Sequence, residues 1–409
     1  MRRGPLRSGP RIRMRRLISI LILFPLAAFA DGTLVIAGGA VSPDNASVYR
    51  AFVDAIPGKG KVAIISAASG SPVESARRAS DALSRYGLRK KDIVHLRLAV
   101  VDDDSTDIVD ESRWMDNGNS EAELGRLEGV RGVWITGGDQ SRLTRVLLAD
   151  GRDTAILGAL RQILDDGGVI GGTSAGAAIM SHPMILFGDT LATLLDDESL
   201  GERLDIGQGI GFFDAGLVDQ HFDARARLGR LAVALQSLPE SQRLGFGIDE
   251  NSAMLVSNND VRVVGEGQLT VVDARDATWA LDTFGYRIDG LRVSVLSPGD
   301  TLKLPSLRLR PAGYLKKTVG NEYFSRREAN AAGIAAPVGR LSEQLGQRLL
   351  DNKAASRWSA PTLVEQDEGF AVLRYVFVQS SDSEGWWGYE PDGPSRYSLH
   401  RVGLSIHID

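Results

Sequence analysis

The chain has 409 residues, a formal net charge of −5, five histidines and no cysteine. Its length suits one large domain with an addition, and its apolar and charged fractions are those of a globular protein. The lack of cysteine excludes disulfides, thiolate catalysis and cysteine–zinc sites. No His-x-x-x-His or His-Glu-x-x-His spacing occurs, so we expect neither a metal nor a cofactor.

Residues 1–30 have the pattern of an export signal. Seven arginines and no acidic residue accompany an apolar run, Leu17–Ala30, that ends in Ala-Phe-Ala before Asp31. The run is short for a membrane span, which needs roughly 20 residues, so we expect cleavage rather than an uncleaved anchor. The expected location is therefore periplasmic or extracellular. Met14 is an alternative start, which would give a signal of ordinary size.

Removal of residues 1–30 takes away seven positive charges and changes the net charge from −5 to −12. An acidic surface argues against nucleic acid as a partner, because phosphates require basic patches. The same surface tolerates or attracts a cationic substrate. A homodimer is compatible with this interpretation, and no membrane span is expected after cleavage.

Short apolar runs alternate with amphipathic stretches from residue 31 onward. They predict strands at 34–37, 62–65, 93–96, 132–135 and 169–171, with helices at 47–55, 72–86, 141–149 and 154–165. Continuous apolar strands separated by helices indicate a mostly parallel sheet in a three-layer α/β/α domain. The glycine-rich strand ends, at 38–39, 137–138 and 171–172, fall at the carboxyl edge where such sheets hold their sites.

The second half of the chain is more mixed. It predicts strands at 217–221 and 244–248, a helix at 224–238 and a hairpin formed by 253–256 and 261–264. We predict that the main domain covers 31–275 and that 276–409 is a C-terminal α+β extension. Within the extension, we expect strands in 291–310, a helical region over 321–353, and strands at 370–379 and 396–408 around a long polar loop.

The strongest local motif is Gly172-Thr173-Ser174-Ala175-Gly176, which lies between a predicted strand and a predicted helix. This is the pattern of a nucleophile elbow, in which small neighbours allow a sharp turn that exposes the serine hydroxyl. The N–H groups of Ala175 and of Gly138 or Asp139 would stabilise an oxyanion. The alternative is a strand-to-helix turn that binds nothing or binds phosphate.

A nucleophilic serine needs a base, and His221 is the best placed of the five histidines because it ends a predicted strand. His182 lies eight residues after Ser174, which is roughly 12 Å along a helix. Strand alternation places Glu250 on the face of residues 246 and 248, so Glu250 is the preferred acid. Asp249 and then Asp219 are the alternatives. The order Ser, His, Glu argues against an esterase of the α/β-hydrolase type.

Three arginines, Arg225, Arg227 and Arg230, follow the histidine. They could form a solvated basic helix face, but their position beside His221 favours a clamp for an acidic peptide backbone. The segment Trp386–Tyr389 would contact a polymer or anchor a loop.

Four motifs in this order resemble the cyanophycinase family of serine peptidases: residues 137–140 (Gly-Gly-Asp-Gln), 172–177, 219–222 (Asp-Gln-His-Phe) and 247–250 (Gly-Ile-Asp-Glu). The resemblance covers residues 33–275 and implies a fold similar to class I glutamine amidotransferases. It implies a triad of Ser174, His221 and Glu250, and a substrate site lined by Gln140, Asp219, Gln220, Arg225, Arg227 and Arg230.

The substrate that the resemblance implies is cyanophycin, a polyaspartate with arginine on each β-carboxyl, cleaved to β-Asp-Arg dipeptides. The export signal and the extension resemble secreted members of the family. Two further hypotheses remain: a dipeptidase for aspartyl or isoaspartyl peptides, and an inactive binding protein on the same fold.

Overall fold

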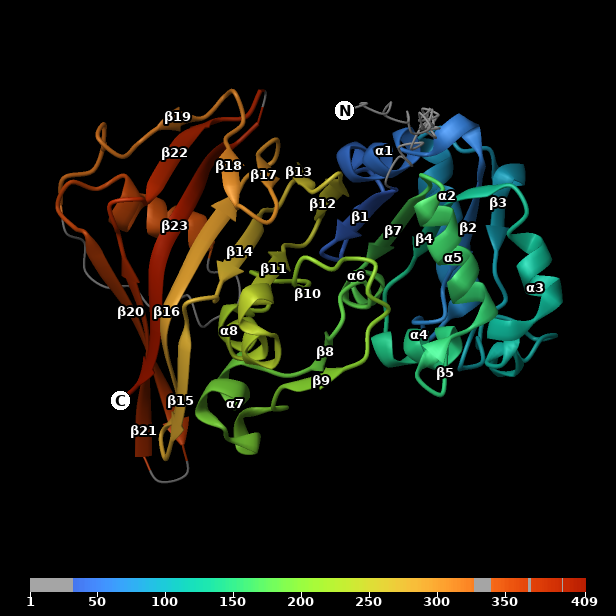
Figure 1. Ribbon diagram of the computed structural model, residues 1–409, viewed down its shortest axis with the longest axis horizontal. Helices are drawn as coiled ribbons and strands as arrows, with labels where there is room; N and C mark the ends of the chain where they lie inside the picture. Colours follow the sequence, from blue (N-terminus) through green and yellow to red (C-terminus); the bar gives the residue numbers. More distant parts are fainter. Residues whose placement is uncertain (1–31, 327–339, 367–368, 392) are drawn as a thin grey trace, which may run out of the picture.

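Two large β-sheets organise the chain, as the computed structural model shows for residues 32–326, 340–366, 369–391 and 393–409 (Figure 1). Within these residues, a nine-stranded sheet has the order β18-β17-β13-β12-β1-β7-β4-β2-β3. The second sheet has ten strands, with β10-β11-β14-β16-β23-β21-β20 as its main path. The parallel part of the first sheet and the C-terminal strands of the second lie at opposite ends of the molecule (Figure 1).

The first sheet contains the predicted parallel strands. They are β1 (Thr33–Ala37), β7 (Val169–Thr173), β4 (Val130–Ile135), β2 (Lys61–Ile65) and β3 (Ile93–His95). Four antiparallel strands continue the sheet beyond β1: β12 (Ser252–Ser257), β13 (Asp260–Gly265), β17 (Thr301–Lys303) and β18 (Arg308–Arg310). The predicted hairpin is thus confirmed as β12 and β13.

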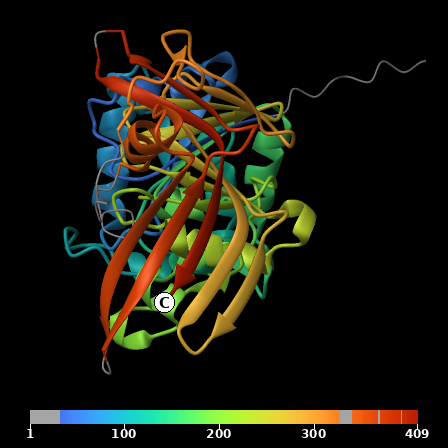
Figure 2. The same ribbon diagram turned by 90° about the vertical axis from the view of Figure 1, so that its left-hand side faces the viewer.

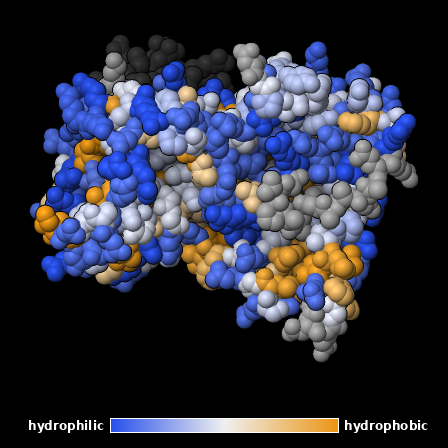
Figure 3. Space-filling model, turned by 180° about the vertical axis from the view of Figure 1, so that it is seen from behind, coloured by the Kyte–Doolittle hydropathy of each residue, from blue (hydrophilic) through white to orange (hydrophobic). Residues whose placement is uncertain are grey.

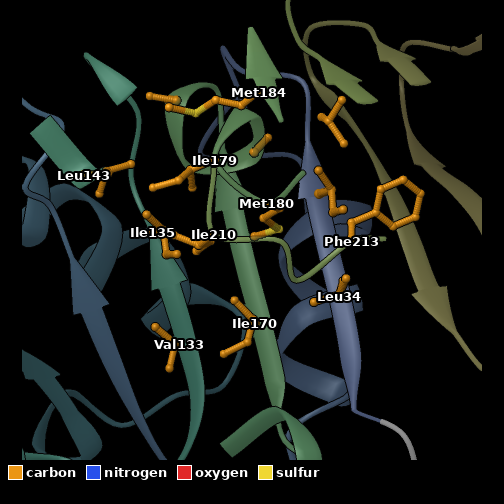
Figure 4. Close-up of a cluster of buried hydrophobic side chains, with 14 of the residues drawn as sticks. Leu34, Val133, Ile135, Leu143, Ile170, Ile179, Met180, Met184, Ile210 and Phe213 are labelled. Atoms are coloured by element: carbon orange, nitrogen blue, oxygen red, sulfur yellow. The ribbon is translucent and has the colours of Figure 1, made fainter. Parts of the chain in front are cut away.

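Helices cover both faces of the parallel strands, which confirms the predicted α/β/α arrangement. One face is covered by α1 (Ala46–Asp54) and α2 (Pro72–Arg85), and the other by α3 (Glu121–Arg126), α4 (Gln140–Leu147), α5 (Ala155–Asp165) and α6 (Ala175–Ala178). Successive strand residues point to opposite faces, so Leu34 joins the core under α5 and Val35 the core under α1. Figure 4 shows Leu34, Val133 and Ile170 on the same side of the sheet.

The second sheet is mostly antiparallel, and β16, β20, β21 and β23 in it are long strands of 10 to 14 residues. Its main path contains β10 (Leu217–Asp219), β11 (Leu244–Ile248), β14 (Leu269–Asp273), β16 (Gly285–Leu296), β23 (Ser395–Ile408), β21 (Gly369–Val378) and β20 (Arg357–Gln366). Figure 2 shows β16, β21 and β23 side by side on the C-terminal side of the molecule. Side strands are β15 (Thr278–Asp282), β19 (Lys316–Lys317) and β22 (Glu384–Tyr389).

Helices α7 (Thr190–Leu195), α8 (Leu228–Ala234) and α9 (Leu341–Leu345) pack on the second sheet, where their apolar residues join one core. Two small two-stranded antiparallel sheets complete the described fold: β5 (Leu148–Ala149) with β6 (Arg152–Asp153), and β8 (Met184–Phe187) with β9 (Asp205–Gly207).

The boundary predicted at residue 275 does not separate the two sheets. Strands β10, β11 and β14 precede it but belong to the sheet that the C-terminal strands complete. Conversely, β17 and β18 follow it but extend the first sheet through β13. Residues 276–409 are therefore part of both sheets rather than an appendage.

Three other predictions differ from the structure. The helix expected over 224–238 is regular only in α8, because residues up to 227 form a turn with Ala226 at φ +51°. In 321–353, the described helical residues are α9 and a π-helical turn, Gly346–Leu350, and 327–339 lie outside the described residues. The polar loop after 379 contains β22, which pairs with β23 and buries Trp386.

Most of the surface seen from behind is hydrophilic, with an apolar patch near the lower right of Figure 3. Strands β15, β20 and β21 reach the corresponding end of the molecule in Figure 1. The exposed apolar side chains on β20, on β21 and on the hairpin of β15 and β16 are Leu281, Phe284, Leu363 and Phe370. Within the described ranges, no helix is long and apolar enough to cross a membrane.

We expect a protein that ends at residue 275 to fail to fold. The truncation removes β16, β23 and β21, which leaves the edge of β14 unpaired and exposes the apolar core under α8. Circular dichroism should show no cooperative unfolding transition for residues 31–275, in contrast to residues 31–409. A fragment 31–275 that unfolds cooperatively would contradict the conclusion that residues 276–409 are an integral part of both sheets.

Candidate active site

Ser174 lies in a sharp turn between β7 and α6. Its backbone has φ +55° and ψ −116°, a strained conformation for a residue with a side chain, and its N–H donates to the Ala37 carbonyl at 3.1 Å. A Cβ on Gly137 would lie 2.9 Å from the Ser174 Cβ, so only glycine fits there without a shift. The turn has the features that the elbow motif predicts, and it presents the hydroxyl at the carboxyl edge of the sheet.

His221 follows β10 and also has a positive φ, +48°. Its N–H donates to the Gly38 carbonyl at 2.7 Å, which fixes the backbone. Gly39 has φ +102°, and a Cβ on it would lie 2.3 Å from the His221 Nε2. A glycine at position 39 therefore allows the imidazole to pack directly against the end of β1.

Glu250 lies just after β11 and precedes Asn251, whose backbone is held by the end of β1. The Asn251 N–H donates to the Gly39 carbonyl at 2.9 Å, and the Asn251 side-chain oxygen accepts from the Ser42 N–H and the Asn45 amide, each at 2.9 Å. Asn251 thereby holds the turn that carries Glu250. Sequence reasoning missed these anchors, although the glycine pair after the first strand indicated that the site lies there.

The three predicted side chains form one hydrogen-bonded chain. Ser174 Oγ lies 2.9 Å from His221 Nε2, and His221 Nδ1 lies 2.6 Å from Glu250 Oε1. Asp249, the alternative acid, faces away, and its carboxylate accepts the N–H groups of Asp223 and Gln268. Strand alternation thus separated the two neighbouring acids correctly in space.

The surroundings of His221 favour a neutral imidazole. Burial lowers its pKa below 6.5, the hydrogen bond with Glu250 acts in the opposite direction, and the positive charge of Arg225 lowers it again. In the neutral ring, Nδ1–H donates to Glu250, which leaves Nε2 to accept the Ser174 hydroxyl proton. This is the arrangement that a general base requires.

Two backbone N–H groups near Ser174 are free to bind an oxyanion. The amides of Ala175 and Gly138 donate no hydrogen bond to the part of the chain that the structure describes. The prediction for Asp139 is wrong, because its N–H donates to the Ala68 carbonyl at 2.9 Å. The Asp139 carboxylate instead caps α4 by accepting the Ser141 N–H.

Two of the three arginines have a structural role that the sequence did not indicate. Arg230 forms two hydrogen bonds with the buried Asp219, at 2.9 Å and 2.5 Å, and Arg227 lies 3.5 Å from the same carboxylate. Arg227 also donates to the Gln220 carbonyl at 2.5 Å. Asp219, Arg227 and Arg230 are all buried, and these hydrogen bonds give them a role in holding the segment before His221. Their contact with substrate stays a prediction.

The electrostatics of this cluster support that role. Burial raises the Asp219 pKa, but Arg230 and Arg227 outweigh burial, and the net shift is downward. Burial lowers the Arg227 pKa to about 10, so this guanidinium remains charged at neutral pH. The ionised carboxylate and the two cations compensate one another in the interior.

The remaining predicted residues divide into two groups. Gln140 is occupied, because its amide donates to the carbonyls of Ile185 and Leu186 and so positions β8. Gln220 is 6% exposed, and its side-chain oxygen has no hydrogen-bond partner within the described chain. Arg225 is exposed on the turn after His221, and the ion pairs of the described residues do not include it. Gln220 and Arg225 thus retain groups that a substrate can use.

Comparison with known proteins identifies the family of the chain. The family model of Peptidase family S51 matches residues 34–264, which is more than half of the chain. The chain belongs to this peptidase family. It is therefore a serine-type peptidase related to the cyanophycinases.

Three curated relatives are cyanophycinases. The one from Nostoc sp. is 32% identical over 293 residues, 70% of this chain and 89% of the relative. That from Synechococcus elongatus is 32% identical over 252 residues, 59% and 69% of the two chains. That from Trichormus variabilis is 37% identical over 193 residues, 46% and 61% of the two chains. A solved peptidase from an acI-B1 Actinobacterium is 17% identical with a TM-score of 0.45, and the match covers 68% of this chain and 98% of that one.

We expect kcat/KM to rise with pH as His221 loses its proton, with a midpoint below 6.5 because burial lowers its pKa. Arg225→Gln removes a positive charge that disfavours the imidazolium. The midpoint should therefore move upward. The control is Arg50→Gln on the exposed side of α1, which should leave the midpoint unchanged. An unchanged or lower midpoint in Arg225→Gln would contradict the assignment of His221 as the titrating base.

Proposed function

We propose that the protein is an exported serine exopeptidase that hydrolyses cyanophycin to β-Asp-Arg dipeptides through an acyl-enzyme on Ser174. The observation that carries the proposal is the hydrogen-bonded chain from Ser174 through His221 to Glu250. The curated relatives named cyanophycinase support the substrate. The basic and apolar segment of residues 1–30 supports export.

The proposed reaction begins when Ser174 Oγ attacks a backbone carbonyl of the polymer and His221 Nε2 takes the hydroxyl proton. Glu250 holds the ring through Nδ1–H and stabilises the imidazolium. The N–H groups of Ala175 and Gly138 stabilise the negative oxygen of the tetrahedral intermediate. His221 then gives its proton to the leaving amine, and water, deprotonated by His221, hydrolyses the acyl-enzyme and restores Ser174.

Substrate binding in this proposal uses the groups that the fold leaves free. The exposed guanidinium of Arg225 is suited to a carboxylate of the polymer. The side-chain oxygen of Gln220 is a buried acceptor without a partner in the described residues, and a substrate N–H would relieve the cost of burying it. Arg227, Arg230 and Asp219 act indirectly, because they position residues 219–221.

Incubation of residues 31–409 with insoluble cyanophycin tests this proposal, with the soluble products analysed by mass. Wild type should release β-Asp-Arg dipeptides, and Ser174→Ala should lower the rate by roughly 10⁴-fold or more, because the nucleophile is lost. Ser47→Ala, on the exposed side of α1, is the matched control and should cleave at the wild-type rate.

Two outcomes would contradict the proposal. A folded wild-type protein that releases no dipeptide is not a cyanophycinase, and a panel of isoaspartyl dipeptides then tests the dipeptidase hypothesis. Undiminished activity in Ser174→Ala would remove this serine as the nucleophile. Export is tested separately, by N-terminal sequencing of the protein recovered outside the cytoplasm, which should begin at Asp31.

A further inference from the structure

An open cavity of about 600 Å³ lies beside the segment that Gln140 and Arg230 hold. Its walls come from β8, α7, β9, α8 and β16, and its ionisable lining is strongly acidic: Asp196, Glu198, Glu202 and Asp205 with Arg203 as the sole cation among the described lining residues. The catalytic assignment above uses none of these side chains. The cavity thus has an excess of three negative charges.

Two of the four carboxylates share one cation. Arg203 lies 2.8 Å from Asp196 and 2.7 Å from Glu198. Glu202 and Asp205 form no ion pair with any described residue, and both are exposed. Two hydrogen bonds with Asp189 fix the Glu202 backbone. The Glu202 N–H donates to the Asp189 carboxylate at 3.1 Å, and the Glu202 carbonyl accepts from the Asp189 N–H at 2.7 Å. The cavity therefore presents two carboxylates without an ion pair among the described residues, one on the loop that Asp189 anchors and one on β9.

The same cavity contains a buried polar group without a partner. Thr193 lies on its wall, is 3% exposed, and its hydroxyl has no hydrogen-bond partner among the described residues. A buried hydroxyl that stays unpaired costs free energy unless a ligand or water binds it. This unpaired hydroxyl is an observation independent of the acidic residues, and a hydrogen-bond donor of a ligand would satisfy its oxygen.

Aromatic rings complete the lining. Phe187 is 45% exposed, and Tyr286 is partly buried on β16. A guanidinium stacks on aromatic faces and donates up to five hydrogen bonds, whereas a lysine ammonium is a compact point charge. Carboxylates, an unpaired hydroxyl and two rings in one cavity therefore favour arginine over lysine.

The cavity is connected to the active site through β8. Phe187 lies between Leu186, whose carbonyl accepts from Gln140, and Gly188, whose carbonyl accepts from Arg230 at 2.7 Å. Gln140 follows the Gly138 oxyanion donor by two residues, and Arg230 binds Asp219, two residues before His221. A ligand that contacts Phe187 is thus next to the end of β8, which hydrogen bonds from Gln140 and Arg230 hold beside the active site.

We propose that this cavity is a second subsite, which binds the guanidinium of an arginine side chain of the substrate. The inference rests on the proposed function, because the arginine that it places in the cavity belongs to the polymer, in a unit remote from the bond that is cleaved. Its effect is to increase the affinity for polymer relative to short substrates. Free arginine compounds have the same chemistry, so the test separates them from the polymer.

The test compares two double variants. The cavity variant is Glu202→Gln/Asp205→Asn, and the loop variant, Asp104→Asn/Asp107→Asn, removes the same charge from an exposed loop after β3. In the Ser174→Ala background, co-sedimentation with cyanophycin measures the polymer concentration at half saturation. That value should increase by about fivefold in the cavity variant, as expected for two partly exposed charge contacts. It should stay at the parent value in the loop variant.

Two kinetic and binding measurements accompany it. In the active enzyme, KM for polymer should rise with little change in kcat, so the ratio of kcat/KM for polymer to that for an oligomer of two β-Asp-Arg units should fall. Arginine amide, followed by ligand-observed NMR, should bind the parent protein more tightly than lysine amide, and the cavity variant should lose this preference.

The outcomes distinguish this inference from the proposed function. A wild-type enzyme that cleaves polymer, with a cavity variant equal to the loop variant in all three measurements, would overturn the subsite and leave the function intact. A wild type that cleaves no polymer would remove the proposed function and with it the polymer subsite, and the NMR titration would then decide whether the cavity binds arginine at all.

Thr193→Val provides a second variant of nearly the same size. The substitution removes a buried hydroxyl without a described partner, so the folded protein should be as stable as the parent or more stable. Arginine amide should nevertheless bind more weakly, because an acceptor for the guanidinium is lost. Unchanged binding would contradict the assignment of this hydroxyl to the ligand.

Discussion

Three consecutive carbonyl groups at the end of β1 determine the geometry of the site. Ala37, Gly38 and Gly39 accept, in that order, the N–H groups of Ser174, His221 and Asn251. Each donor belongs to a different segment of the chain, and each of these segments carries one member of the Ser-His-Glu chain. The hydrogen bonds hold Ser174, His221 and Asn251 at positive φ, a strained backbone that persists only where the surroundings fix it.

The second sheet supplies two of these three segments, which explains why the C-terminal region is interlocked with the site. β10 precedes His221 and β11 precedes Glu250, and both strands are aligned by β14 and β16. Gln268 extends the connection: its backbone bonds with Asp249, and its side chain bonds with Ser297, Ser342 and the Tyr397 carbonyl. Residues far along the chain thereby support the turn beside Glu250.

The features that were predictable from the sequence are those that depend on local pattern. Apolar runs and glycine-rich strand ends identified the parallel strands, and the small residues around Ser174 identified the elbow. The scarcity of histidine indicated His221, and strand alternation separated Glu250 from Asp249, as the observed contacts of Asp249 show.

The features that were not predictable depend on contacts between distant segments. The pairing of β16 with β23 joins residues more than 100 positions apart, so the C-terminal strands of the second sheet were interpreted as an extension. Arg227 and Arg230 have the sequence pattern of a substrate clamp, and only the buried Asp219 beside them reveals another role. The Asp139 amide likewise looked free until the Ala68 carbonyl was located next to it.

The most direct test of the account is covalent labelling by a fluorophosphonate, because this reagent reacts with serine hydroxyls that a neighbouring base activates. Peptide mass analysis of the folded protein should find one adduct, on Ser174, with none in a folded His221→Ala variant. Labelling elsewhere, or equally fast labelling of Ser174 without His221, would show that this histidine does not activate the serine and would contradict the central claim.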